Sequence, residues 1–334
     1  MKRAHSFVLI CGLALAPACT SPSRAPSRAT EAPKPSATAV AMASPSSSEA
    51  PPAAPDATPT PSAAAPAPEA PPYDLEADRA ARITTAKAEL GAHISTAIVG
   101  DVFVLVGPPG FQGASFARSA SLVRSSTEAY LNGRFDARPA QAITVYLFGD
   151  DARYQAFCKK KYSGPCISKY GFYQPSTRDM VMNAGLGLGT LTHELVHPFV
   201  ETDFPDAPTW INEGIASVFE APVLPRKGEI HGAKNWRLPR LLQAMRSAEK
   251  PKARLDRLFG MSDTTFRGDD EDLHYALARY VCQWLDERGK LWPFYRKWRD
   301  TVRDDPTGER AFAEVAEMTP TAAHALFAKW VVRL

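Results

Sequence analysis

The sequence has little that is typical of nucleic-acid or nucleotide-binding proteins. Its formal net charge is only +3, and the basic run Lys159-Lys160-Lys161 is short enough to be a solvated face. Gly185, Gly187 and Gly189 lack the G-x-x-x-x-G-K-[ST] pattern of a phosphate-binding loop, and a flexible strand-to-helix turn explains them. No internal repeat and no apolar run beyond the first residues are found. We therefore expect no nucleic-acid partner and no second membrane segment.

The N-terminus has the layout of a secretory signal. Lys2 and Arg3 precede an apolar run that ends in Ala16-Pro17-Ala18, just before Cys19. The small residues before Cys19 loosely resemble a bacterial lipobox, in which this cysteine is lipidated, although the leucine is one place off. Simple cleavage after Ala18 is the alternative. Either route predicts export, and lipidation predicts a lipoprotein of the cell envelope, in the periplasm or at the outer membrane, attached to the membrane through its N-terminus.

Residues 20–72 lack aromatic side chains altogether. Pro, Ala, Ser and Thr dominate this stretch, which holds 14 of the 30 prolines. Such a segment buries too little apolar surface to offset its ordering entropy, so the sequence predicts a disordered tether from Cys19 to Pro72. The folded part is expected at 73–334, long enough for one sizeable core.

Cysteine is scarce, and three of the five residues lie in the expected folded part. Cys158 and Cys166 flank a turn-rich loop and can form a disulfide in an oxidising compartment. Zinc binding by this pair is the alternative, but no histidine lies near them in the sequence. Cys282 lies in an apolar helical pattern and is expected to be a buried free thiol.

Histidine is also scarce, with 7 residues, yet two of them lie four apart in His193-Glu194-Leu195-Val196-His197. An α-helix turns about 100° per residue, so both histidines lie on one face and can reach one metal ion. Glu194 can hold and deprotonate a water on that metal without being a ligand. The alternative is a surface helix with two solvated histidines.

A third zinc ligand is expected from the segment Trp210-Ile211-Asn212-Glu213-Gly214. Tetrahedral zinc in hydrolases takes three protein ligands and keeps a position open for water. An apolar stripe at helical spacing runs through this segment and the residues after it, which predicts a second helix packed on the first. The stripe consists of Ile211, Ile215, Val218 and Phe219. With that stripe buried, Glu213 can be turned toward the metal.

These two motifs resemble those of the gluzincins, the metallopeptidase clan of thermolysin and the alanyl aminopeptidases. The resemblance covers about residues 140–334 and is nearest to bacterial peptidase MA-like families of unassigned substrate. It implies a zinc ion held by His193, His197 and Glu213, with Glu194 as general base. It also implies that the strand at Met180 to Asn183 lies at a sheet edge and pairs with extended substrate, the alternative being an ordinary edge strand.

The sequence departs from that family pattern at two places. Only fifteen residues separate His197 from Glu213, and Pro198 should kink or end the helix near the second histidine. In the rival metzincin pattern the third ligand lies six residues after the second histidine, where Asp203 stands. Val200 replaces the glycine of that pattern, which favours a loop or capping role for Asp203.

Tyr275 resembles a tyrosine that gluzincins place opposite the zinc. Hydrolysis of an amide develops negative charge on oxygen, and a phenol can stabilise it by donating a hydrogen bond. The alternative is a core tyrosine on the apolar stripe of its helix. His274 and His231 are expected to be surface or hydrogen-bonded histidines, and Asn212 and Glu220 to support packing or ligand orientation.

The pattern of elements predicts an α+β, zincin-like fold. Its first lobe, about 90–204, carries a mixed β-sheet and the H-E-x-x-H helix, and its second, about 205–334, is mainly helical. Helices are expected over 74–90, 114–131, 151–160, 238–246, 274–287, 291–302 and 321–332, and strands over 93–106 as a hairpin, 143–148, 170–173 and 178–183.

The sequence therefore predicts an exported zinc metallopeptidase that hydrolyses peptide bonds in a peptide or protein substrate. A protein of another class remains open as the alternative. This is an inactive cell-envelope binding protein on a zincin fold, whose zinc site is structural or vestigial. Retention of Glu194, which contributes no ligand bond, favours the enzyme.

Overall fold

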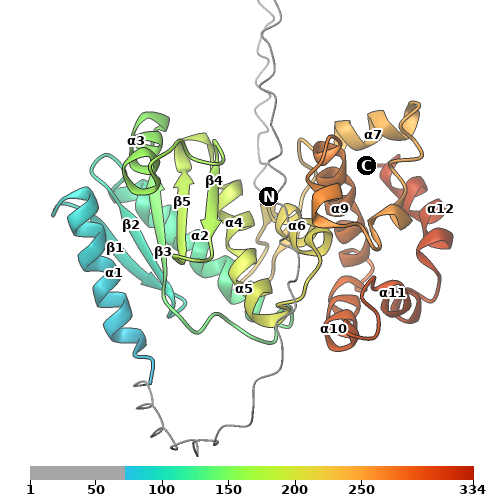
Figure 1. Ribbon diagram of the computed structural model, residues 1–334, viewed down its shortest axis with the longest axis horizontal. Coiled ribbons are helices and arrows are strands. Elements are labelled where there is room, and N and C mark those ends of the chain that lie inside the picture. The colour runs from blue at the N-terminus through green and yellow to red at the C-terminus, as the bar shows by residue number, and fades with distance from the viewer. Residues whose placement is uncertain (1–71) are drawn as a thin grey trace, which may run out of the picture. The chain divides into compact units, whose positions relative to one another are not determined.

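A five-stranded mixed β-sheet and a group of helices make up the part of the chain that the structure, a computed structural model, describes, residues 72–334 (Figure 1). The predicted leader, Cys19 and the tether up to residue 71 lie outside the described residues. The strand order is β1-β2-β3-β5-β4, where β2, β3 and β5 are parallel and β1 and β4 run antiparallel at the two edges. The strands are β1 (Ser95–Val99), β2 (Phe103–Gly107), β3 (Ile143–Phe148), β4 (Gly171–Gln174) and β5 (Asp179–Asn183).

The sheet order corrects one prediction. Met180 to Asn183 belong to β5, which pairs with β3 on one side and with β4 on the other, so they are not an edge strand. The edge beside the candidate site is β4. The N–H groups of Gly171 and Tyr173 already donate to Ser168 Oγ and to Glu194, so among the backbone groups that do not face β5 the carbonyl groups are the ones left to meet another chain.

Both faces of the sheet are covered, because alternate residues of each strand point to opposite sides. In β3, Val145 and Leu147 pack in one core with α2 and the H-E-x-x-H region, whereas Tyr146 and Phe148 pack in a second core with α1 and α3. The helices of this part are α1 (Leu75–Leu90), α2 (Gly113–Leu131), α3 (Asp151–Tyr162), α4 (Gly189–Glu194) and α5 (Val196–Asp203).

The rest of the chain is mainly helical, as expected. α6 packs along α9, and Gly214 lies in this contact, where an added Cβ would come within 2.7 Å of Cys282 Sγ. Cys282 is buried and not disulfide-bonded, which confirms the predicted free thiol. The remaining elements are α6 (Thr209–Val218), α7 (Leu238–Arg246), α8 (Asp263–Phe266), α9 (Glu271–Asp286), α10 (Leu291–Thr301), α11 (Glu309–Ala316), α12 (Pro320–Val331), the 3-10 turns η1 (Ala184–Leu186) and η2 (Leu255–Leu258), and the short pair β6 (Pro222–Val223) and β7 (His231–Gly232).

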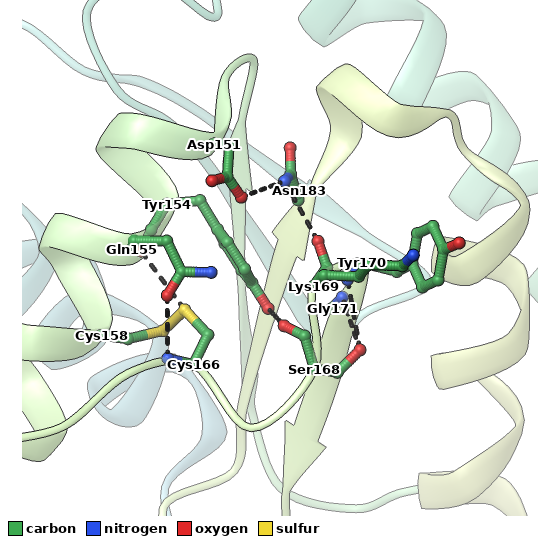
Figure 2. The surroundings of a disulfide bond; sticks show 10 residues. All are labelled: Asp151, Tyr154, Gln155, Cys158, Cys166, Ser168, Lys169, Tyr170, Gly171 and Asn183. Carbon is green, nitrogen blue, oxygen red and sulfur yellow. Dashed lines mark hydrogen bonds between the residues drawn. A yellow bond between two sulfur atoms is a disulfide. The ribbon is translucent and has the colours of Figure 1, made fainter. Parts of the chain in front are cut away.

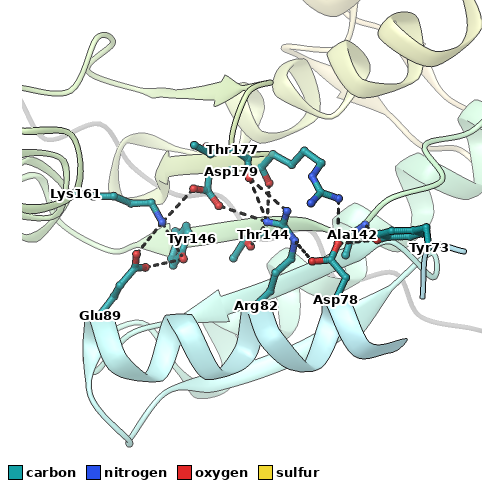
Figure 3. A network of polar contacts seen from close by, with 11 residues as sticks. Tyr73, Asp78, Arg82, Glu89, Ala142, Thr144, Tyr146, Lys161, Thr177 and Asp179 are labelled. Atoms are coloured by element: carbon teal, nitrogen blue, oxygen red, sulfur yellow. Dashed lines mark hydrogen bonds and ion pairs between the residues drawn. The ribbon is translucent and has the colours of Figure 1, made fainter. Parts of the chain in front are cut away.

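A polar network ties α1 to the sheet (Figure 3). Arg82 donates to Thr144 Oγ1 at 2.9 Å, and Lys161 Nζ lies 2.8 Å from Glu89 and 3.0 Å from the buried Asp179. Lys161 is thus part-buried, which corrects the prediction that the whole basic run is solvated. The long Lys161 side chain reaches over Tyr146 to meet two carboxylates, a contact that its position in a short charged run does not reveal.

Asp78 in this network gives the fold an acid-sensitive contact. Burial alone would raise the pKa of Asp78, but the hydrogen bond from Tyr73 and the charges of Arg82 and Arg178 lower it below its usual value. A lowered folded-state pKa stabilises the fold above the unfolded pKa of about 4, and this stabilisation is lost as the pH falls through the folded value.

We expect Asp78→Asn to cost about 1–2 kcal/mol of unfolding free energy at pH 6.5, because hydrogen bonds to a charged group are lost. The difference from wild type should shrink as the pH falls through the lowered folded-state pKa of Asp78, where the carboxylate itself becomes protonated. Urea unfolding at pH 6.5 and at a series of acidic pH values measures this. A difference that stays the same down to the lowest pH at which the protein is folded would show that the charge of Asp78 does not matter.

The disulfide between Cys158 and Cys166 is present, with Cα atoms 5.2 Å apart (Figure 2). This confirms the predicted pair and removes the alternative of zinc binding by it. Disulfides persist in oxidising compartments, so the bond suggests an extracellular or otherwise oxidising location. Among residues 72–334, no helix combines the length and the apolar character needed to cross a bilayer.

Candidate metal centre

The two histidines of the H-E-x-x-H motif lie together although the helix breaks between them. α4 ends at Glu194 and α5 begins at Val196, because Pro198 has no N–H to bond the carbonyl of Glu194. This is the interruption predicted near Pro198. The rings of His193 and His197 remain 5.0 Å apart, and His193, Glu194 and His197 each offer a ligand atom within 4.8 Å of the others. This triad could hold a metal ion.

α6 brings Glu213 to the same place. The four residues of its predicted apolar stripe are all buried, and Glu213 is buried as well. Glu213 Oε2 lies 3.3 Å from His193 Nε2, and it is buried without a hydrogen bond to any residue of the described chain. Two ligands of a tetrahedral zinc, each bound at about 2.0–2.1 Å, lie roughly 3.3–3.4 Å apart. The spacing and the unpaired carboxylate oxygen therefore fit a metal ion between the two side chains.

Two neighbours orient the imidazole rings. His197 Nδ1 lies 2.9 Å from Asn212 Oδ1, which can only accept, so Nδ1 carries the proton and Nε2 is free. His193 Nδ1 lies 3.3 Å from Glu220 Oε1. Both rings thus present Nε2 to the site, and an outer carboxylate or amide partner of this kind is what metal-bound histidines generally have. The sequence prediction of an orienting role for Asn212 and Glu220 agrees with these contacts.

Glu220 is itself held firmly. Arg237 donates to its two oxygens at 2.8 and 2.6 Å, and Asn235 donates to Oε2 at 2.9 Å. The backbone of Glu220 touches the start of α4, where a Cβ added to Gly189 would lie 2.2 Å from the Glu220 carbonyl oxygen. Glycine at 189 therefore lets α4 approach closely enough for His193 to meet Glu220.

The electrostatics of the site favour a bound cation. Burial lowers the pKa of His193, but the adjacent carboxylates of Glu213 and Glu220 outweigh burial and raise it to about 10. Burial would raise the pKa of Glu213, whereas His197, His193 and Arg267 lower it far below its usual value. For Glu220, Arg237 and His193 outweigh burial and lower the pKa to about 2. Carboxylates that stabilise a proton on His193 will also stabilise a divalent cation in its place.

Glu194 differs from Glu213 in its surroundings. It lies 3.8 Å from His197 Nε2 and accepts a hydrogen bond of 3.0 Å from the backbone N–H of Tyr173 in the edge strand β4. This contact holds the carboxylate close to His197. Glu194 is thus placed where it could meet a metal ion, or a water beside one.

Comparison with known proteins adds no assignment. No protein-family model matches the chain, and no curated protein is significantly similar to it. What this site does must therefore be inferred from its own residues.

A cleft of about 1100 Å³ opens over the site. Its lining includes Tyr275 from α9 together with His193, Glu194, His197 and Glu213. Burial and the charge of Glu213 raise the pKa of Tyr275, which keeps the phenol protonated and able to donate. The candidate residues are therefore brought to one cavity.

Arg267 is a site residue that sequence reasoning missed. Its guanidinium donates to Glu213 Oε1 at 2.9 Å and to Tyr275 Oη at 3.1 Å, joining the third candidate ligand to the candidate hydrogen-bond donor. It lies beyond the short helix α8, in a stretch without strong periodicity, so no pattern marks it. Arg237, which holds Glu220, was missed for the same reason.

The rival residues lie elsewhere. Asp203 is the last residue of α5, so it is not itself a loop residue. It accepts hydrogen bonds from the backbone of Asp136 and Ala137 and pairs with Arg299 at 3.0 Å, contacts that do not fit the metzincin ligand. His274 Nδ1 lies 3.0 Å from the carbonyl of Phe266, and His231 pairs with Glu229. Neither lines the cleft.

Glu220 offers a test of this centre that leaves the candidate ligands intact. We expect Glu220→Gln to weaken zinc binding by about 10–100-fold, because His193 loses the charged partner that orients its ring. Competition with a chromophoric chelator measures the affinity. Glu229→Gln, which removes a carboxylate near His231, should leave zinc binding unchanged. Equal affinity of Glu220→Gln and wild type would rule out a supporting role for Glu220.

Proposed function

We propose that this protein is an exported zinc metallopeptidase of the gluzincin type. The observation that carries the proposal is the unpaired, buried Glu213 Oε2 at 3.3 Å from His193 Nε2, beside His197 and Glu194 and beneath an open cleft. In this proposal His193, His197 and Glu213 hold Zn²⁺. Their donor set of two imidazoles and one carboxylate is one that catalytic zinc sites use.

Bound there by His193, His197 and Glu213, zinc would supply a lowered pKa for a water molecule and polarisation of the substrate carbonyl. Glu194 takes the proton of the attacking water and passes it to the leaving amine. The backbone N–H of Tyr173 holds the Glu194 carboxylate in position for both transfers. Tyr275, kept protonated by burial and by Glu213, donates a hydrogen bond to the oxygen on which negative charge develops.

An extended peptide is the substrate that suits the surroundings of the site. The edge strand β4 contributes Gly171, Phe172 and Tyr173 to the wall of the cleft. The carbonyl groups of an edge strand can accept hydrogen bonds from an extended chain, while the N–H of Tyr173 stays bonded to Glu194. We propose this role for β4 in place of the one expected of Met180 to Asn183.

We also propose that the protein is exported and attached to a membrane through its N-terminus. The oxidised Cys158–Cys166 pair supports a location outside the reducing cytoplasm. Lipidation at Cys19 would attach the chain to a membrane, and the proline-rich stretch would connect it to the folded part. Metabolic labelling with a radioactive fatty acid, compared between wild type and Cys19→Ala, tests the lipid anchor.

Removal of the metal tests the proposed reaction. We expect the purified full chain to cleave casein, to lose at least about 99% of this activity in 1,10-phenanthroline, and to regain it when one equivalent of zinc is restored, because the polarising ion and its water leave together. Cleavage that continues after zinc is removed would contradict the proposal. Stoichiometric zinc without cleavage of any unfolded protein would favour the binding-protein alternative.

A further inference from the structure

Exposed apolar side chains gather at the mouth of the cleft. Among residues 72–334, ten large apolar side chains are exposed, and four of them line this one cleft. A single exposed apolar residue is ordinary, but a group of them beside one cavity indicates binding. The four, called here the apolar rim, are Ile167 (77% exposed), Tyr170 (43%), Leu186 (55%) and Trp236 (62%).

The loop that carries Ile167 and Tyr170 is fixed from behind (Figure 2). Cys166 is bonded to Cys158 of α3, and Tyr154 Oη donates to the carbonyl of Ser168 at 2.6 Å. In the same loop, Asn183 Nδ2 donates to the carbonyl of Lys169 at 3.1 Å, and Ser168 Oγ accepts from the backbone N–H of Tyr170 at 3.2 Å. Figure 2 shows the Tyr170 ring extending from the side of the loop opposite the disulfide.

This anchoring lowers the cost of binding. A loop that is already ordered loses little conformational entropy when a ligand settles on it. The backbone contacts of the loop therefore preorganise the rim.

Trp236 approaches the cleft from the helical part of the chain. It precedes Arg237, whose guanidinium is fixed on Glu220 and lies 5.9 Å from the Trp236 ring centre. Leu186 belongs to η1, between β5 and α4. Three rim residues thus come from the sheet part and one from the helical part, and all four line the cleft of the candidate metal centre.

Charged groups line the cleft beside the rim. The buried carboxylates of Glu194 and Glu213 lie there with the more exposed Arg267 and Glu271. An acyl chain lying there would contact these charged groups at a desolvation cost. An extended polypeptide can place its polar backbone against these groups and its apolar side chains against the rim.

We propose that the apolar rim binds the apolar and aromatic side chains of an extended, unfolded polypeptide. The proposal rests on the proposed peptidase function and names its substrate class. Proteins that have lost their fold, or segments that never fold, expose such side chains. A folded protein keeps them in its core.

Binding can be measured apart from cleavage by using the full chain with Glu194→Gln. The probes are two fluorescent, unstructured peptides of equal length and charge, one with Leu and Phe at alternate positions and the other with Ser and Gln there. Fluorescence anisotropy should show the apolar peptide binding at least about tenfold more tightly. A triple variant of the rim should bind the two peptides equally well. Its substitutions are Ile167→Ser, Tyr170→Ser and Trp236→Ser. Ile98→Ser/Leu326→Ser, which changes two exposed apolar residues away from the cleft, should keep the preference for the apolar peptide.

Three results would overturn the proposal. One is equal binding of the two peptides by the unsubstituted rim, and another is an equal loss in the rim and control variants. In the third, the rim variant no longer binds phosphatidylethanolamine–phosphatidylglycerol vesicles that the unsubstituted chain binds, while its peptide binding is unchanged. That result would assign the rim to a lipid surface. Selective peptide binding by a chain whose wild type cleaves nothing would support the rim and contradict the peptidase.

Discussion

Glu194→Gln should hold zinc as tightly as wild type and cleave peptides at least about a hundredfold more slowly. The amide keeps the size of the carboxylate and can still accept the hydrogen bond from the N–H of Tyr173. It cannot take a proton from water at neutral pH. The loss should therefore appear in kcat, with KM little changed, because the groups that bind the substrate are the same.

The control for this variant is Glu201→Gln. Glu201 lies in α5, one helix beyond Glu194, lines the same cleft and accepts a hydrogen bond from the Tyr173 hydroxyl at 3.2 Å. In the described part of the chain its carboxylate forms no ion pair with the candidate ligands. Glu201→Gln should retain kcat within about twofold. Loss of zinc from Glu194→Gln would mean that Glu194 is itself a ligand, and full activity would exclude it as the base.

Glu213→Gln should weaken zinc binding by at least about a hundredfold. Mutation of a residue that only hydrogen-bonds a metal ligand typically weakens metal binding by about 10–100-fold. Mutation of a charged ligand itself should weaken it by at least as much. Glu213 Oε2 lies 3.3 Å from His193 Nε2 and makes no other polar contact in the described part of the chain, so the amide can offer only a neutral ligand. Chelator competition at fixed pH gives the affinity, and circular dichroism of the metal-free proteins checks the fold.

Glu271→Gln is the matched control for this experiment. Glu271 lines the same cleft and lies 4.0 Å from Arg267, which also binds Glu213, so both variants remove one negative charge near the same arginine. Zinc affinity should be unchanged in Glu271→Gln. If Glu213→Gln bound zinc as well as this control, the third ligand would have to be another residue, with Glu194 the nearest candidate in the described chain.

The local elements were predictable from the sequence because each has a local pattern. The β-branched and apolar run Ile143 to Phe148 and the helical spacing in Ala114 to Leu131 correspond to β3 and α2, and the Gly100-Asp101 turn joins β1 to β2. The metal-binding residues were recognisable for a similar reason. Two histidines four apart on a helix make a local pattern, and Glu213 follows an apolar stripe that fixes the direction in which its side chain points.

What could not be predicted depends on contacts between distant segments. The order of β4 and β5 in the sheet is decided by which strand packs against β3, and neither strand contains that information. The burial of Lys161 requires Glu89 and Asp179 to meet from separate elements. Arg267 reaches Glu213 across fifty-four positions of the chain, a contact made by a side chain in a segment of no regular pattern.

The zinc content of the purified full chain tests the central claim most directly. Inductively coupled plasma mass spectrometry should find about one zinc per wild-type chain and close to none in His193→Ala/His197→Ala, since two of three protein ligands are then missing. The double variant should still show the circular dichroism of a folded protein. A wild-type chain that holds no zinc, or a double variant that holds as much as wild type, would contradict the assignment of this site.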